Sequence, residues 1–169
     1  MMSHPDSEAP AVGQQVITAC AFIHQRVDGI PKVFMARRSM NKKFLPGVYE
    51  LPGGHVEFGE DPIVGLKREV REELALDINV GDPFAAFTYT NELKGSHSIE
   101  VIYFATLPND TNDIILNLQD HSEYGWFAED ELASATTLDK SLEDDEFTAI
   151  KTGFRILAGR YDVAETESE

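Results

Sequence analysis

Three glutamates, Glu69, Glu72 and Glu73, fall within five consecutive positions of the segment REVREEL. On a helix, which turns by about 100° per residue, these spacings of three and four bring the side chains onto one face as neighbours. Like charges so placed cost the helix about 0.2–0.5 kcal/mol per pair. A solvated acidic face is one interpretation. Binding of Mg²⁺, which prefers carboxylate oxygens and substrate phosphates, is the other.

A glycine pair upstream strengthens the metal interpretation. Gly53 and Gly54 can adopt φ > 0 and let backbone groups approach a ligand closely, so that a carbonyl there could complete a metal site. The spacing from this pair to the acids is regular. Five residues separate Gly54 from Glu60, seven more lead to Arg68 and Glu69, and two further residues lead to Glu72 and Glu73.

This spacing resembles the signature of the Nudix hydrolase family, which is glycine, five residues, glutamate, seven residues, Arg-Glu, an aliphatic residue, one residue, Glu-Glu, one residue, glycine and an aliphatic residue. The matching segment here is GHVEFGEDPIVGLKREVREELAL, from Gly54 to Leu76. It departs from the signature at Ala75, where the family has glycine. We expect that position to be a left-handed helix cap, at which alanine costs about 1 kcal/mol. Because Ala75 carries no ligand atom, the resemblance still implies an active site.

The resemblance implies the family's fold, an α/β/α sandwich with a mixed β-sheet and the motif helix beside it. We expect this domain to occupy residues 15–160, after a flexible tail at 1–14 and before an acidic tail at 161–169. The resemblance also implies hydrolysis of a pyrophosphate bond in a nucleoside diphosphate derivative, with Mg²⁺ or Mn²⁺ as cofactor.

The resemblance further assigns roles within the motif. Glu69, Glu72 and Glu73 would be metal ligands, and Gly53 would offer its carbonyl oxygen. Arg68 would orient a helix glutamate through an ion pair, although a plain surface salt bridge is the alternative.

The general base differs among family members, and two carboxylates remain candidates. Glu69 is one, and Glu123, expected on a late loop in SEYGWF, is the other. Four further residues are candidates for contact with substrate or metal. They are a basic residue that ends a strand, a carboxylate just upstream of the motif helix, and two aromatic residues beside the glycine turn: Arg38, Glu57, Tyr49 and Phe44.

The substrate class stays open at this stage. A nucleoside triphosphate, including an oxidised one as in short members of the family, is the first hypothesis. ADP-ribose or a nucleotide sugar is the second, and a non-catalytic domain that senses a nucleotide is an alternative of another class. Family members are often homodimers, and the resemblance therefore implies a homodimer as one assembly of this chain.

Periodicity predicts the elements that position the motif. Ile63, Leu66, Val70 and Leu74 form an apolar stripe, with Asp61 as a good N-cap, so a helix is expected over 62–74. A second helix is expected within 144–160 and a short one from 128. Strands are expected at residues 16–25, 32–38, 48–57, 84–92, 98–107, 114–118 and 124–128.

Composition narrows the function further. The chain has 169 residues and a net charge of −16, from 30 acidic and 14 basic residues. That balance disfavours binding to nucleic-acid backbones or anionic membranes. Cys20 is the single cysteine, so no intrachain disulfide is possible, and we expect a buried thiol. The N-terminus has no signal-peptide pattern, and a cytoplasmic location is therefore expected.

Overall fold

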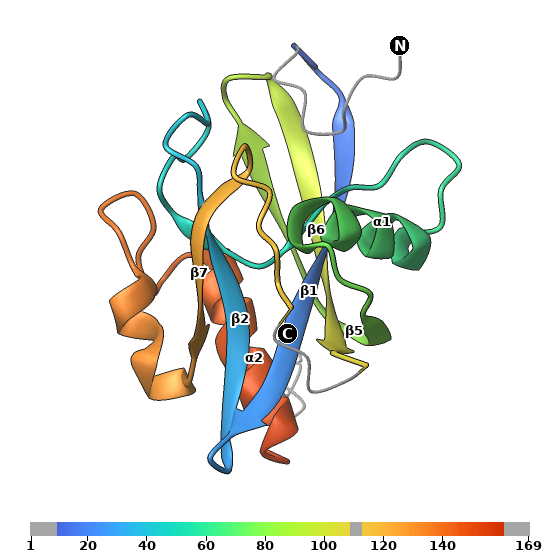
Figure 1. The fold of residues 1–169 in the computed structure, drawn as a ribbon. Coiled ribbons are helices and arrows are strands. Elements are labelled where there is room, and N and C mark those ends of the chain that lie inside the picture. Colours follow the sequence, from blue (N-terminus) through green and yellow to red (C-terminus); the bar gives the residue numbers. More distant parts are fainter. Residues whose placement is uncertain (1–9, 109–112, 161–169) are drawn as a thin grey trace, which may run out of the picture.

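The computed structural model describes residues 10–108 and 113–160, which form a seven-stranded mixed sheet in the order β3-β2-β1-β6-β5, with β4 paired to β1 and β7 paired to β2 (Figure 1). The strands span β1 Gln15–Val27, β2 Ile30–Arg38, β3 Tyr49–Glu50, β4 Gly53–His55, β5 Asn79–Asn91, β6 Ser96–Thr106 and β7 His121–Phe127. The expected mixed α/β fold is confirmed.

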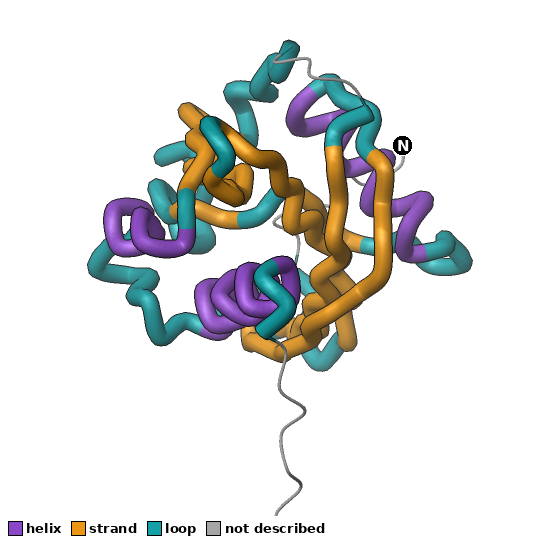
Figure 2. The backbone as a smooth tube through the Cα atoms, turned by 90° about the horizontal axis from the view of Figure 1, so that it is seen from below, coloured by secondary structure: helices purple, strands orange, loops and turns teal. Residues whose placement is uncertain are grey.

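Two α-helices cover opposite faces of this sheet. α1 is Pro62–Leu74 and α2 is Asp145–Leu157, while a 3₁₀ helix, η1, spans Glu129–Ala135. Figure 2 shows the strands running between the two α-helices, as an α/β/α sandwich requires.

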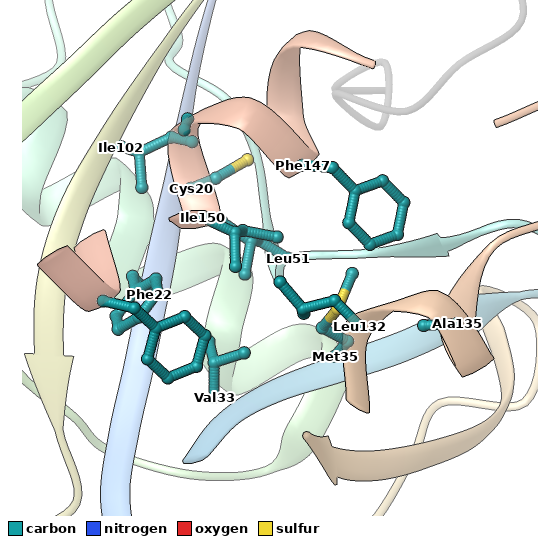
Figure 3. Packing of buried hydrophobic residues seen from close by; sticks show 12 residues of the cluster. Cys20, Phe22, Val33, Met35, Leu51, Ile102, Leu132, Ala135, Phe147 and Ile150 are labelled. Atoms are coloured by element: carbon teal, nitrogen blue, oxygen red, sulfur yellow. The ribbon is translucent and has the colours of Figure 1, made fainter. Parts of the chain in front are cut away.

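The sandwich follows from the alternation of side chains along β1, which is apolar on both faces. Cys20 and Phe22 pack towards α2, in a cluster that includes Ile102, Phe147 and Ile150 (Figure 3). The intervening residues face the other way. They join the buried stripe of α1 in a second cluster that includes Ala19, Ala21, Ile23, Leu66, Val70 and Leu74.

β1 also positions the glycine pair. Its first half pairs in parallel with β6 on one side and antiparallel with β4 on the other. Its second half instead pairs with β2, through a hairpin whose two turn residues, Asp28 and Gly29, both have positive φ. β4 therefore pairs with β1 over the part of β1 that β2 does not cover, and it places Gly53 and Gly54 next to α1.

The ends of α1 follow the sequence. The Asp61 side chain accepts hydrogen bonds from the backbone N–H groups of Ile63 and Val64, so it is the N-cap that we expected. Ala75 ends the helix at φ 55° and ψ 34°, which confirms a left-handed cap held by alanine rather than glycine.

Some expected elements differ in the structure. No strand forms at 114–118. The N–H groups of Ile115 and Asn117 instead bind the carbonyl oxygens of Leu74 and Glu73, and so complete hydrogen bonds that α1 leaves open. The strand expected at 48–57 forms two short strands, β3 and β4, because the extended structure is interrupted at Pro52. The expected short helix after 128 is the 3₁₀ helix η1.

The chain ends are described only in part. Residues 1–9 and 161–169 lie outside the described residues, and with them most of both expected tails. Within 10–14, the N–H groups of Ala11 and Gly13 donate to the carbonyl oxygens of Lys94 and Gly95 in the β5–β6 turn. No helix in the described part of the chain is long and apolar enough to cross a membrane.

The left-handed cap predicts that Ala75→Gly stabilises the protein. Glycine adopts φ near 55° without the Cβ penalty, so we expect about 1 kcal/mol of added unfolding free energy and a melting temperature about 2–4 °C higher. The matched control is Ala158→Gly at the end of α2, where φ is −84° and glycine relieves nothing. Equal effects of both substitutions in thermal or denaturant unfolding would contradict the explanation.

Candidate active site

The glycine pair allows a contact between backbone and carboxylate that any side chain would block. A Cβ built on Gly53, whose φ is +148°, would lie 2.2 Å from the carbonyl oxygen of Ala19. A Cβ on Gly54 would lie 2.5 Å from the carboxyl group of Glu69. Gly53 therefore requires glycine, because its close neighbours are backbone atoms and its φ is positive, whereas a side chain at position 54 would displace the Glu69 carboxyl group.

The three motif glutamates are unequally exposed. Glu69 and Glu73 are buried, at 0% and 3% exposure, whereas the Glu72 side chain is 37% exposed. Glu73 is tied to the glycine pair, because its Oε2 accepts a hydrogen bond of 3.1 Å from the N–H of Gly53. The buried carboxylates of Glu69 and Glu73 thus contact the glycine pair of β4, and the Glu72 carboxylate is partly exposed to solvent.

Arg68 links the start of the motif to its end. Its guanidinium donates two hydrogen bonds, of 2.9 and 3.0 Å, to the Glu60 carboxylate and another of 2.8 Å to Glu69 Oε1. It also donates to the carbonyl oxygen of His55 and lies 3.5 Å from Glu72 Oε1. Hydrogen bonding to Arg68 lowers the pKa of Glu60, so this carboxyl group is ionised at neutral pH.

A cavity of about 570 Å³ opens beside the glycine pair. Gly53, Gly54 and Glu73 line it, together with Arg38 of β2, aromatic side chains of β5 and acidic side chains of β3, β6 and α2. Its volume is in the range of small-molecule sites, roughly 300–1,000 Å³. The motif helix therefore reaches the cavity through Glu73 beside the glycine pair of β4, whereas Glu69 and Glu72 are not among the lining residues.

The structure places two of the four candidate contact residues in this cavity. Arg38 and Phe44 line it, and the Arg38 guanidinium is held by the Phe44 carbonyl oxygen and by Glu50. Phe44 stacks against Tyr89 with ring centroids 6.2 Å apart. Glu57 is exposed in the loop before α1 and is not among the lining residues.

Tyr49 and Glu123 lie elsewhere and contact each other. The Tyr49 hydroxyl donates a 2.9 Å hydrogen bond to Glu123 Oε1, and Arg37 donates another of 3.1 Å. Glu123 was expected on a loop, but it lies within strand β7, where it pairs with Arg37 of β2. Hydrogen bonds from Tyr49 and Arg37 lower its pKa. Neither Tyr49 nor Glu123 is among the residues that line the cavity.

A buried polar group, which was not predicted from the sequence, lies on the cavity floor. Glu100 and Glu146 lie there at 5% exposure each, and Lys140 is 7% exposed. Lys140 Nζ binds Glu146 Oε1 at 2.8 Å, and although burial acts to lower the pKa of Lys140, the hydrogen bond and charge of Glu146 together with the charges of Glu50 and Asp144 raise it. Glu50 lies close by, and although burial acts to raise its pKa, Arg38 and His121 lower it to about 2.

Two of these acids left a signal in the sequence. Glu100 stands between apolar residues in a strand, at a position that alternates onto the same face as Ile102. Glu146 lies four residues before Ile150, within the apolar stripe of the closing helix. A charge on a buried face points to a partner or a site. Lys140 left no comparable signal.

The motif residues fit a hard divalent cation. Their donors are all oxygen atoms, and glycine at positions 53 and 54 leaves the space beside the Glu69 carboxylate that a Cβ would fill. Mg²⁺ and Mn²⁺ favour such carboxylate and carbonyl ligands. The deeper group of Cys20, Glu100 and Glu146, whose ligand atoms lie within 4.8 Å of one another, fits less well. Burial raises the pKa of the Cys20 thiol well above its usual value, and Lys140 already binds Glu146.

Comparisons with known proteins agree with this geometry. The family model of the NUDIX domain matches residues 15–149. An uncharacterised Nudix hydrolase, all7351, of Nostoc is 42% identical over 55 residues, which are 32% of this chain and 32% of that protein. The nucleoside triphosphatase NudI of Salmonella schwarzengrund is 31% identical over 107 residues, 59% of this chain and 74% of that protein.

A solved structure extends the comparison to the whole fold. The Ap4A hydrolase of C. elegans, in a binary complex, superposes with a TM-score of 0.70 at 20% identity, over 85% of this chain and 98% of that one. This likeness concerns the fold. The chain spans about a third of the length of the Nostoc relative. With the NUDIX model covering most of the sequence and the motif built around Gly53 and Gly54, the chain belongs to the Nudix family.

Proposed function

We propose that the protein is a metal-dependent hydrolase that cuts the pyrophosphate bond of a nucleoside triphosphate or a related nucleoside diphosphate derivative. The observation that carries the proposal is the contact of the α1 carboxylates Glu69 and Glu73 with Gly53 and Gly54 of β4, where Glu73 and both glycines line a cavity of about 570 Å³. Membership of the Nudix family supports the same reaction class.

Glu69, Glu72, Glu73 and the Gly53 carbonyl oxygen would hold Mg²⁺ or Mn²⁺. The bound cation would neutralise the pyrophosphate and lower the pKa of a bound water. The protein's own part is orientation. Arg68 fixes the Glu69 carboxylate, and the Gly53 N–H fixes that of Glu73, so neither has to be ordered when substrate arrives.

Of the two candidate bases, Glu69 is the better placed. Its carboxyl group lies against Gly54, which lines the cavity, so it belongs to the group of residues that would hold the cation. Glu123 is separate from that group, because it lies in β7 bound to Tyr49 and Arg37 and does not line the cavity. We therefore propose Glu69 as the general base and Glu123 as a residue that holds β7 against β2.

The cavity supports a nucleotide substrate. Phe44, Phe87 and Tyr89 offer aromatic surface for a base, and Lys42 and Lys43 lie among the residues near Arg38 that can attract phosphates. The name of the NudI relative favours a nucleoside triphosphate over ADP-ribose or a nucleotide sugar. Arg38 itself binds Glu50 and the Phe44 carbonyl oxygen, so we propose that it positions the Phe44 loop against the substrate.

Glu72→Gln tests the hydrolase directly. Removing one ligand charge should lower kcat by more than about 100-fold, because even outer partners of metal ligands contribute about 10- to 100-fold. The measurement is release of nucleoside monophosphate and orthophosphate or pyrophosphate from a panel of nucleoside triphosphates, ADP-ribose and nucleotide sugars, with Mg²⁺ and with EDTA.

The matched control for this variant is Glu131→Gln on η1, an exposed carboxylate bound to Lys32, which should leave turnover unchanged. Turnover that survives both EDTA and Glu72→Gln would overturn the metal-dependent mechanism. Nucleotide binding without turnover across the panel would instead indicate a nucleotide-sensing domain.

Glu60→Gln tests the positioning role of the Arg68 network. The amide keeps the shape but loses the charge that anchors Arg68, so Arg68 and Glu69 should be less well ordered. We expect the Mg²⁺ concentration for half-maximal rate to rise about 10- to 100-fold, with a smaller change of kcat at saturating Mg²⁺. An unchanged Mg²⁺ dependence in the rate titration would show that the ion pair serves stability alone.

A further inference from the structure

The β2–β3 loop, residues 39–48, forms one wall of the cavity and depends on other elements for its shape. It consists of turns and bends, and two of its residues, Leu45 and Gly47, have positive φ. An irregular segment of this kind keeps one conformation only where its neighbours hold it. Four of its residues line the cavity: Lys42, Lys43, Phe44 and Leu45.

Asp120, the residue before β7, binds this loop through both its backbone and its side chain. Its carbonyl oxygen accepts a 2.8 Å hydrogen bond from the N–H of Ser39, and its Oδ1 lies 2.8 Å from Lys42 Nζ. The side chains of Asp120 and Lys42 are only 9% and 18% exposed, so solvent screens this ion pair less than a surface pair. Asp120 therefore fixes where the Lys42 ammonium group lies at the cavity wall.

Asp120 is itself positioned by the end of α1. The N–H of Asn117 donates a 2.9 Å hydrogen bond to the carbonyl oxygen of Glu73. The N–H groups of Asp120 and His121 in turn donate hydrogen bonds of 3.0 Å to the carbonyl oxygen of Asn117. Figure 1 shows this segment passing α1 before the chain enters β7. A continuous series of contacts thus connects the helix of the proposed metal ligands to Lys42.

His121 gives the loop a second anchor from the same segment. Its side chain is buried, and its Nε2 lies 2.9 Å from Glu50 Oε1. Arg38 binds the same Glu50 oxygen at 3.3 Å and donates a 3.0 Å hydrogen bond from Nε to the carbonyl oxygen of Phe44. Two adjacent residues therefore hold the loop, one at Lys42 and the other, through Glu50 and Arg38, at Phe44.

We propose that Asp120 is a positioning residue for the hydrolase reaction, which holds Lys42 and the β2–β3 loop in a fixed place relative to the metal ligands on α1. A lysine ammonium group has three N–H donors, so Lys42 bound to Asp120 can still donate to a phosphate oxygen of the substrate. Ordering Lys42 before the substrate arrives lowers the entropy cost of binding. The inference rests on the proposed function for the identity of the ligand, but the order of the loop can be measured without one.

The first measurement is hydrogen–deuterium exchange of the backbone amides of residues 40–45 in the ligand-free protein. Asp120→Ala removes the ion pair and should speed their exchange about tenfold, because the loop opens more often. Asp120→Asn keeps an acceptor for Lys42 and should give a smaller increase. The matched control is Glu131→Ala, which breaks an ion pair of 3.0 Å with Lys32 outside the cavity lining and should leave these amides unchanged.

The second measurement is binding, by calorimetry, of α,β-methylene analogues of the common nucleoside triphosphates with Mg²⁺. Asp120→Ala should weaken their binding about tenfold, and Lys42→Ala by at least as much. The double variant should bind no more weakly than Lys42→Ala, because Asp120 acts through Lys42. For a hydrolysed substrate, KM should rise by a similar factor, while kcat and the Mg²⁺ concentration for half-maximal rate stay within about twofold.

Each outcome decides the inference. Unchanged loop exchange in Asp120→Ala would overturn it. Faster exchange with unchanged affinity, additive losses in the double variant, or failure of every analogue to bind the wild type would overturn it as well. Weaker binding that is absent in the Lys42→Ala background would support it, even if no substrate in the panel were hydrolysed. Circular dichroism shows whether Asp120→Ala folds, and if it does not, Asp120→Asn with Lys42→Ala provides the same comparison.

Discussion

The whole site depends on the close approach of β4 to its two neighbours. Gly53 lies against the backbone of Ala19, and Gly54 lies against the carboxyl group of Glu69. A single methyl group would clash with the β1 backbone at position 53 and with the Glu69 carboxyl group at position 54. Because β4 contributes only Gly53–His55, the approach depends on the support of β1 on one side and α1 on the other. The fold thus holds the carboxylate face of α1 against the glycine pair of the short strand β4.

The protein handles buried negative charge in two different ways. In the motif, the charges of Glu60 and Glu69 are offset by Arg68. On the cavity floor, Lys140 offsets Glu146, and burial and the neighbouring Glu146 raise the pKa of Glu100 well above its usual value. The first arrangement keeps oxygen atoms charged for a cation, and the second favours a proton on the buried Glu100. A net charge of −16 is therefore compatible with binding an anionic nucleotide.

Features of the fold and the site could be predicted from the sequence where they depend on residues close together along the chain. The helix over 62–74, its Asp61 cap and the left-handed Ala75 depend on neighbouring residues, and all three were predicted. The segment 114–118 has strand composition, but it lies against the last turn of α1, a contact that no local pattern encodes. Glu123, expected on a loop, lies in β7, and only the pairing of β3 and β7 with β2 brings Tyr49 and Glu123 together. The floor group joins residues from β1, β6 and α2, far apart in sequence, and so only the structure reveals it.

The most direct test of this account is the position of Mn²⁺ in crystals of the protein, located by anomalous scattering. The account predicts a peak between Glu69, Glu72, Glu73 and the carbonyl oxygen of Gly53. It also predicts no peak beside Cys20, Glu100 and Glu146, because that group keeps its proton and its lysine. A peak at the cavity floor with none at the motif helix would contradict the proposed metal centre.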